Sequence, residues 1–222
     1  MKEIYILKGT SGESYPQFSE RIFNLIERIK LLEKIIKIKL TLTEVLPPKI
    51  SIIPFKKEKV AVISIVLDKN TDLSFIVESN GFIGSYEVEE AVPVAYKPTW
   101  ELGEITPGAC LLTLFHSRKD IDYDTFIDRW HNSHTPLSLR LHPLWNYIRN
   151  VVKRATVEDS VWYDGIVEEH VRSKRELLNP FIFFGPFFKV PYHMLLVYRD
   201  TKSFIDYKRI ETYLVNEYIV RR

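Results

Sequence analysis

Residues 36–43 read Ile-Lys-Ile-Lys-Leu-Thr-Leu-Thr, with apolar side chains at every even position and polar side chains at every odd one. A period of two places alternate side chains on opposite faces of a strand, so this stretch predicts a β-strand with one face buried. Residues 60–67 read Val-Ala-Val-Ile-Ser-Ile-Val-Leu, which is almost continuously apolar. That pattern is typical of a central strand covered on both faces. The two stretches predict a sheet in the first half of the chain.

Each half of the chain shows the order strand, helix, strand, strand, helix, strand. In the first half, strands are expected at 4–7, 36–43, 60–67 and 86–96, and helices at 18–32 and 72–79. In the second half, strands are expected at 111–115, 145–155, 161–170 and 213–220, and helices at 124–141, near 174–178 and near 203–208. Pro93 suggests that strand 86–96 lies at a sheet edge.

Residue matches at constant spacing support an internal duplication. Tyr15, Phe18 and Arg21 match Tyr123, Phe126 and Arg129, each pair 108 positions apart, and Tyr86, Val88 and Glu90 match Tyr213, Val215 and Glu217, each pair 127 apart. A βαββαβ unit forms an antiparallel sheet with helices on one face and leaves the other face bare. The expected fold class is therefore α+β, with two tandem ferredoxin-like (βαββαβ) repeats that press their bare faces together into a pseudo-dimeric α+β barrel.

The bulk composition excludes several classes of protein. The 222 residues carry 31 basic and 29 acidic side chains, a net charge of +2, so no strong field indicates a nucleic-acid or membrane partner. The apolar window 181–198 is interrupted by Pro186, Lys189 and Pro191, which argues against a membrane span. The only cysteine, Cys110, lies in an apolar run that predicts a buried strand residue, and one cysteine fits a reducing compartment. A cytoplasmic location is expected.

The segment 126–137 carries the first candidate for chemistry. His131 and His134 lie one helical turn apart, and Pro136 follows inside an otherwise amphipathic run. Proline removes a backbone donor, so the helix is expected to kink at His134. Histidine is the side chain that titrates near neutrality, which suits His134 to acid–base work. The alternative is a structural role, in which the ring bonds the carbonyl freed by the proline.

Four pieces of the second half occur in an order that resembles the EthD family. They are Phe126-x-x-x-Trp130-x-x-x-His134-Thr-Pro136-Leu137, then Tyr147-x-x-Asn150, then Tyr163-Asp164-Gly165-x-x-Glu168, and finally 215–220, together spanning roughly Cys110 to Val220. The first half resembles a degenerate copy in which Ile26 stands where the second has His134. This gives two expected domains, a degenerate repeat at 1–100 and an EthD-like repeat at 101–222.

The resemblance implies a small barrel with an apolar cavity between sheet and helices. Relatives of the family are similar to cofactor-free decarboxylases and tailoring enzymes for polycyclic aromatics, and the wider barrels include metal-independent monooxygenases, isomerases and haem-handling enzymes. The usual subunit of this family has one domain, so a chain with both halves departs from that pattern. On this basis we expect a catalytic His134 that requires no cofactor.

Other polar residues are candidates to assist His134. Tyr147 and Tyr163 are expected in strands, where their hydroxyls either reach the cavity or simply pack. Asp164 and Glu168 differ by four positions and so share a sheet face, which makes them an acid–base pair if that face is internal. His131 with His134 has a spacing that could hold one metal, but no third ligand lies nearby, so no metal is expected. His131 and Trp130 are retained as ligand-binding candidates.

The run 180–188 contains five phenylalanines without helical or strand periodicity. An exposed apolar run promotes aggregation, so the segment is expected to be covered. It forms either the wall of an apolar pocket, with Phe184 and Phe187 touching the ligand, or a subunit interface, which leaves a homodimer open.

The sequence thus predicts an EthD-like protein that binds a small apolar or aromatic compound. The expected activity is a cofactor-independent oxidoreductase or a proton-transfer, decarboxylase-like reaction, with His134, Tyr147 and Glu168 as catalytic residues and Tyr163 and Asp164 near the ligand. Two alternatives stay open: a non-catalytic binding or accessory protein, and a haem-binding barrel in which His134 or His131 contacts the iron.

Overall fold

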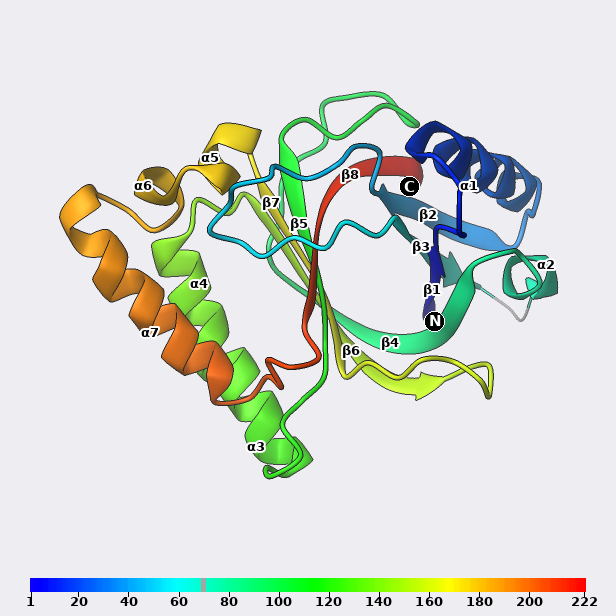
Figure 1. The fold of residues 1–222 in the computed structure, drawn as a ribbon. Helices are drawn as coiled ribbons and strands as arrows, with labels where there is room; N and C mark the ends of the chain where they lie inside the picture. Colours follow the sequence, from blue (N-terminus) through cyan, green and yellow to red (C-terminus); the bar gives the residue numbers. More distant parts are fainter. Residues whose placement is uncertain (69–70) are drawn as a thin grey trace.

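The eight strands close into one antiparallel barrel in the computed structural model, which describes residues 1–68 and 71–222 (Figure 1). The strand order around the barrel is β1-β3-β2-β8-β5-β7-β6-β4, and β4 pairs with β1 to close it. The strands are β1 (Lys2–Lys8), β2 (Ile35–Leu42), β3 (Val60–Leu67), β4 (Phe82–Val94), β5 (Ala109–Phe115), β6 (Asn146–Ala155), β7 (Gly165–Val171) and β8 (Glu211–Arg221).

Helices lie outside the barrel, α1 and α2 beside the strands of the first half and the others beside those of the second (Figure 1). They are α1 (Tyr15–Lys30), α2 (Ser74–Val77), α3 (Tyr123–Asp128), the π-helical turn η1 (Arg129–His134), α4 (Thr135–Leu141), α5 (Lys174–Leu178), α6 (Pro180–Phe183), the 3-10 turn η2 (Phe187–Lys189) and α7 (Val190–Lys202). Within the described residues, none of these helices has the length and apolar character needed to cross a bilayer.

The prediction of two tandem ferredoxin-like α+β repeats is wrong. The strands do not form two separate sheets with bare faces pressed together, because β2 pairs directly with β8, and β4 pairs with β6, to give one continuous closed sheet. The helical parts of the halves also differ, since α2 has four residues whereas α5, α6, η2 and α7 occupy the corresponding place in the second half. These two strand pairs, each of which joins one half of the chain to the other, close the sheet into a barrel. The division at residue 100 falls between β4 and β5 and stays a prediction.

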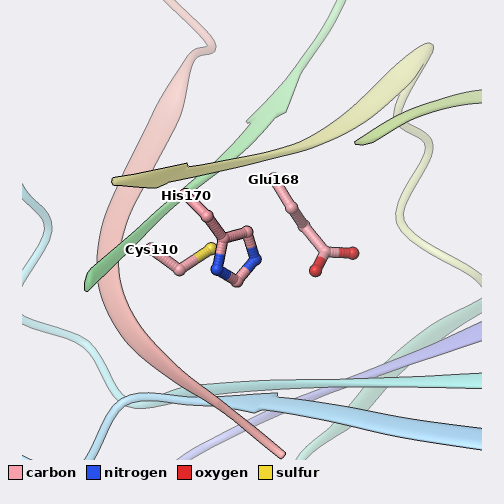
Figure 2. A group of neighbouring side chains, drawn as sticks. All are labelled: Cys110, Glu168 and His170. Carbon is pink, nitrogen blue, oxygen red and sulfur yellow. The ribbon is translucent and has the colours of Figure 1, made fainter. Parts of the chain in front are cut away.

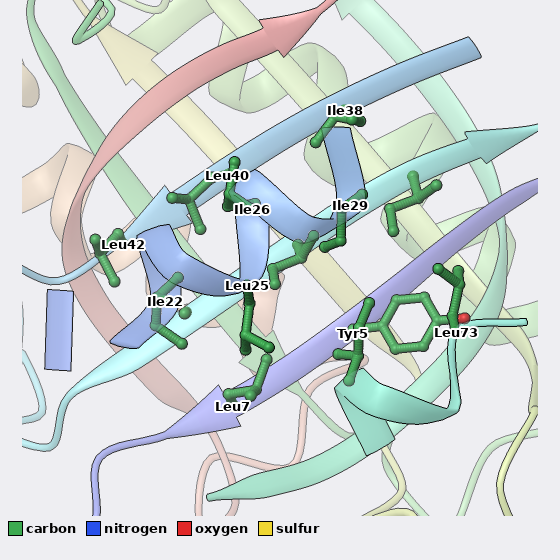
Figure 3. Close-up of a cluster of buried hydrophobic side chains, with 14 of the residues drawn as sticks. Tyr5, Leu7, Ile22, Leu25, Ile26, Ile29, Ile38, Leu40, Leu42 and Leu73 are labelled. Atoms are coloured by element: carbon green, nitrogen blue, oxygen red, sulfur yellow. The ribbon is translucent and has the colours of Figure 1, made fainter. Parts of the chain in front are cut away.

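Helix α1 covers the outside of the first-half strands, as its periodicity predicts. Ser14 and Gln17 form a capping box at its start, and Pro16 occupies the first turn, where its missing N–H costs nothing. Its apolar face packs against β1, β2 and β3 (Figure 3). The helical members of this core are Phe18, Ile22, Leu25, Ile26 and Ile29.

The alternating strand β2 is covered on both faces, not on one as expected. Ile38, Leu40 and Leu42 belong to the core beneath α1 (Figure 3). Lys39, on the opposite face, bonds Glu168 of β7, and these two strands are not neighbours in the sheet. Their contact therefore crosses the inside of the barrel. Lys39 and Thr41 of β2 therefore face the barrel interior, whereas Lys37 near the start of the strand is exposed.

Pro93 does not mark an edge strand. Strand β4 is paired on both sides, with β1 and with β6, and the register with β6 shifts between Ala91 and Val94. Proline cannot donate to a ladder, and an irregularity in the pairing accommodates it without a lost bond.

The end of the second half also differs from the expectation. The predicted helix near 203–208 is absent from the described chain, and α7 at 190–202 takes its place. The sequence did not predict α7, because Pro191 was interpreted as a break in the apolar window. In the structure it lies in the first turn of the helix, where proline is tolerated.

Candidate functional site

A cavity of about 310 Å³ lies between the outer face of β5 and β7 and the helices of the second half. Most of its wall is apolar or aromatic, and the loop between β2 and β3 closes one side. The apolar lining consists of Ile52, Ile53, Pro54, Leu111, Phe115, Trp130, Tyr147, Val167, Phe183, Phe184, Val197, Phe204, Ile205, Tyr207 and Ile210. The polar lining consists of Thr113, His134, Ser138, His142, Glu169, Thr201 and Thr212.

Strand register places the sheet wall of this cavity. Glu169 of β7 lies opposite Leu111 of β5 and opposite Tyr147 of β6. Side chains of directly opposed residues are within contact distance on one face of an antiparallel sheet. The carboxyl of Glu169 therefore lies between an aliphatic and an aromatic neighbour, on the cavity side of the sheet.

His134 lies at the end of η1, where the expected helix distortion takes the form of a π-helical turn. The N–H of Thr135 bonds the carbonyl of Trp130, five residues earlier, and Pro136 follows in the first turn of α4. Such widened turns are frequent at functional sites because they reorient a side chain relative to a regular helix. The turn places His134 in the cavity wall, with its ring centroid 5.4 Å from that of Phe204.

Both ring nitrogens of His134 have partners. Nδ1 lies 2.8 Å from Oδ2 of Asp200 on α7, and Nε2 lies 3.1 Å from Oγ of Ser138, one turn further along α4. A carboxylate accepts only, so Nδ1 carries the proton and Nε2 accepts from the Ser138 hydroxyl. Burial alone would raise the pKa of Asp200, but hydrogen bonds from His134 and Ser133 outweigh burial and lower it. Asp200 is thus an anion that fixes the tautomer of His134.

Two further polar groups face the apolar cavity without partners among the residues described. Burial raises the pKa of Glu169, an effect that His134 partly offsets. The hydroxyl of Tyr147 is fully buried beside Thr135 and Trp130 and makes no well-aligned hydrogen bond, and burial together with Glu169 raises its pKa. Buried polar groups are normally satisfied, so an unpartnered pair in a cavity is suited to bind polar atoms of a ligand.

The structure brings four of the sequence-predicted site residues together. His134, Tyr147, Trp130 and Phe184 all line the cavity. Trp130 and Tyr147 are also almost completely buried.

Five other candidates lie elsewhere. Glu168 points into the barrel and bonds Lys39 at 2.7 Å, because neighbouring residues of a strand face opposite sides. Tyr163 also lies outside the cavity and donates to Glu211 at 2.9 Å. Asp164 precedes β7 and accepts from the Ser117 N–H, so it shares no strand face with Glu168. His131 and Phe187 also lie outside the cavity lining.

His131 and Phe187 differ in their surroundings. The ring of His131 packs beside Trp130, and burial lowers its pKa. Phe187 is 75% exposed, so the expectation that the phenylalanine run is covered holds for Phe183 and Phe184 but fails for Phe187 and Phe188. Phe183 in α6 and Phe184 directly after it face inward, whereas Phe181 at the start of α6 is 49% exposed and η2 leaves Phe187 and Phe188 at the surface.

Three residues of the site were missed from the sequence: Ser138, Glu169 and Asp200. Ser138 lies four residues after His134, the spacing at which helical side chains meet. Glu169 follows Glu168 directly, and the alternation of the strand could have indicated that one of them faces each side. Asp200 had no signal, because the helix that carries it was not predicted.

Comparisons with known proteins identify the fold but no family. No family model matches the chain, and no curated protein does. A candidate monooxygenase from Fusobacterium nucleatum is similar in structure over 99% of this chain and 92% of its own, with a TM-score of 0.53 and 7% identity. An anthrone oxidase-like protein is similar over 99% and 91%, with a TM-score of 0.55 and 10% identity. At such identities the likeness establishes a shared fold, and the EthD resemblance stays a prediction.

Proposed function

We propose that the cavity binds a small apolar or aromatic compound and that His134 removes a proton from it without a cofactor. The observation that carries the proposal is the hydrogen-bonded chain Asp200–His134–Ser138 in the wall of a mostly apolar cavity. A base held by an anionic partner in a largely apolar site is an arrangement suited to general-base catalysis.

The proton is taken by Nε2 of His134. This atom accepts a weak hydrogen bond from Ser138, and a ligand proton replaces that bond when the serine hydroxyl rotates. Asp200 holds the ring through Nδ1 and stabilises the imidazolium that forms, as the buried aspartate does in hydrolytic triads. Ser133 donates to the other oxygen of Asp200 at 2.5 Å and keeps the carboxylate oriented.

Glu169 and Tyr147 complete the site as hydrogen-bond donors. Because burial raises the pKa of Glu169, its protonated form persists to higher pH than in an exposed glutamate. A protonated carboxyl and a phenol can donate to the carbonyl or phenolate oxygen of a bound aromatic compound, which stabilises the anion formed by proton loss. The apolar wall accommodates the rest of the ring system.

Oxidation can follow from the same first step. A resonance-stabilised carbanion donates electrons directly to dioxygen, which would be the co-substrate. The names of the two structural neighbours, a candidate monooxygenase and an anthrone oxidase-like protein, support an oxidative outcome. Proton abstraction is the first step of both the proton-transfer reaction and the oxidation, and it is the step that the residues of this chain explain.

Anthrone, an aromatic ketone with an acidic methylene group, is a suitable probe. We expect the protein to accelerate hydrogen–deuterium exchange at that methylene under nitrogen, and oxygen uptake to start in air. His134→Gln removes the base and should lower exchange by at least about a hundredfold. His116→Gln is the matched control, because this histidine lies outside the cavity lining. Equal exchange rates in wild type and His134→Gln would refute the assignment.

The apolar lining also favours a second candidate, a binding protein without turnover. A native mass spectrum of freshly purified protein distinguishes the two: a retained compound that is never converted supports the binding protein, whereas exchange or oxidation of added anthrone supports the enzyme. The haem alternative stays a prediction, because Nε2 of His134 bonds only the Ser138 hydroxyl. A Soret band on addition of haemin would support this alternative, and its absence would remove it.

A further inference from the structure

A second group of reactive side chains lies inside the barrel, on the opposite side of β7 from the cavity. Cys110 of β5 and His170 of β7 are directly opposed in the strand register, and Glu168 lies two residues before His170 on the same face. The sulfur, a ring nitrogen and a carboxylate oxygen all lie within 4.8 Å of one another (Figure 2). The three side chains come from two paired strands, so the ladder itself fixes their positions.

Several atoms of this group lack a hydrogen-bond partner within the described residues. They are Oε1 of Glu168, Nε2 of His170 and Oε2 of Glu217 on β8. Glu168, His170 and Glu217 are at most 1% exposed, so solvent does not satisfy these atoms. Nε2 of His170 and Oε2 of Glu217 lie 3.1 Å apart and so contact each other, although they are poorly aligned, whereas Oε1 of Glu168 has no partner among the described residues. Leaving a buried carboxylate oxygen unpaired is costly, which indicates that something binds it.

We propose that Cys110, Glu168 and His170 bind one Zn²⁺ ion inside the barrel. A thiolate, an imidazole and a carboxylate are the three ligand types that zinc accepts in tetrahedral sites. Glu217 is close enough to His170 to orient the ring or to supply the fourth ligand. This site contrasts with the sequence-based expectation of no metal, which considered only His131 and His134.

The surrounding charges favour a divalent cation. Lys39 lies 2.7 Å from Oε2 of Glu168 and 3.6 Å from Oε2 of Glu217, so its ammonium faces two carboxylates. Lys2 and Glu90 also lie nearby, but they pair with each other and their charges cancel. When the thiol of Cys110 coordinates, it loses its proton and adds a further negative charge. One doubly charged ion then leaves the group neutral, whereas a monovalent ion does not. Lys39 uses only one oxygen of Glu168 and leaves Oε1 for the metal.

A hollow lies beside this group. It measures about 330 Å³ and is lined by Lys39, Ser64, Glu90 and Tyr96, among others. The ring of Tyr96 lies 5.8 Å from that of His170, and its hydroxyl donates to Glu217. Tyr96 therefore connects the hollow to the buried group.

The test uses the full chain, treated with a chelator to remove metal and then unfolded and refolded with one equivalent of Co²⁺. Refolding in the presence of the ion ensures that slow diffusion of Co²⁺ into the folded barrel cannot prevent binding. Because Cys110 is the only cysteine, a thiolate-to-cobalt absorption band can arise from this residue alone. We expect a stoichiometric band that Zn²⁺ abolishes, a higher melting temperature with Zn²⁺, and zinc by elemental analysis of the untreated protein.

Variants locate the site. Cys110→Ser and His170→Gln should each lose the cobalt band or weaken Co²⁺ affinity at least tenfold, whereas His193→Gln, on α7, should retain the band. Absence of the band in folded wild-type protein overturns the proposal without reliance on any variant. A band that persists in His170→Gln also overturns it. Neither result bears on the exchange chemistry of His134, since the two groups lie on opposite faces of β7.

Discussion

At the scale of single residues, the site depends on two carboxyl groups whose pKa values are set by burial and by hydrogen bonds. Asp200 is an acid with a lowered pKa and Glu169 one with a raised pKa, although both lie near His134. The difference arises because Asp200 accepts hydrogen bonds from Ser133 and His134, whereas Glu169 meets an apolar environment. Two carboxyls with opposite shifts beside one imidazole provide a base partner and an acid in the same cavity.

His142 gives a prediction on pH and stability. Burial lowers its pKa to about 4 from an ordinary 6.5, while Nδ1 bonds the carbonyl of Phe183. The unfolded chain therefore takes up the proton first as pH falls, so the free energy of unfolding decreases between pH 6.5 and 4. The full effect is about 3 kcal/mol.

Urea denaturation at several pH values checks this. His142→Asn keeps a donor for Phe183 but does not titrate, and its free energy of unfolding should vary less than that of the wild type in this window. Parallel pH profiles for the two proteins would contradict the assignment.

At the scale of elements, α1 owes its position to one apolar face. Ile26 is 2% exposed in the core between α1 and the barrel. Truncation to alanine leaves a cavity that close packing cannot fill, so Ile26→Ala should lower the free energy of unfolding by about 2–5 kcal/mol. Leu31, just beyond the helix, is 80% exposed, and Leu31→Ala should change it by less than about 0.5 kcal/mol. Thermal and urea unfolding measure both; similar losses would show that α1 does not pack as described.

The elements also show which parts of this fold a sequence can predict. Helix α1 and strands β2 and β3 follow from periodicity, because each has apolar residues at the spacing of its own structure. Helix α7 does not, since Tyr192, Leu195 and Tyr198 are between 43% and 64% exposed and blur its apolar face. Asp200, the partner of His134, was not predicted because it lies on α7. Because neighbouring residues of a strand point to opposite faces, Glu168 and Glu169 cannot both face the cavity. The sequence does not tell which of them does.

At the scale of the whole molecule, contacts across the barrel interior join the two halves. Lys39 comes from the first half and Glu168 and Glu217 from the second. Although burial acts against its charge, these carboxylates raise the pKa of Lys39. Lys39→Met removes the cation and leaves buried carboxylates uncompensated, so it should lower the free energy of unfolding by about 3–5 kcal/mol.

A second substitution tests whether charge is the cause. Glu168→Gln in the Lys39→Met background removes one of the stranded negative charges and should recover part of the loss. Chemical denaturation of the two variants measures this recovery. No recovery would mean that the lysine contributes through packing of its stem rather than through its charge.

The loop between β2 and β3 has a consequence for dividing the chain. It leaves the first half and reaches the helices of the second (Figure 1), where Ile52, Ile53 and Pro54 wall the cavity and Thr212 bonds the carbonyl of Pro54 at 2.9 Å. A fragment of residues 101–222 would contain His134, Asp200 and Glu169, but its cavity would lack the wall that the β2–β3 loop provides. Binding of an apolar fluorescent dye would then require the fragment of residues 1–100 as well. Mixing the two separately expressed fragments would therefore increase the fluorescence of the dye.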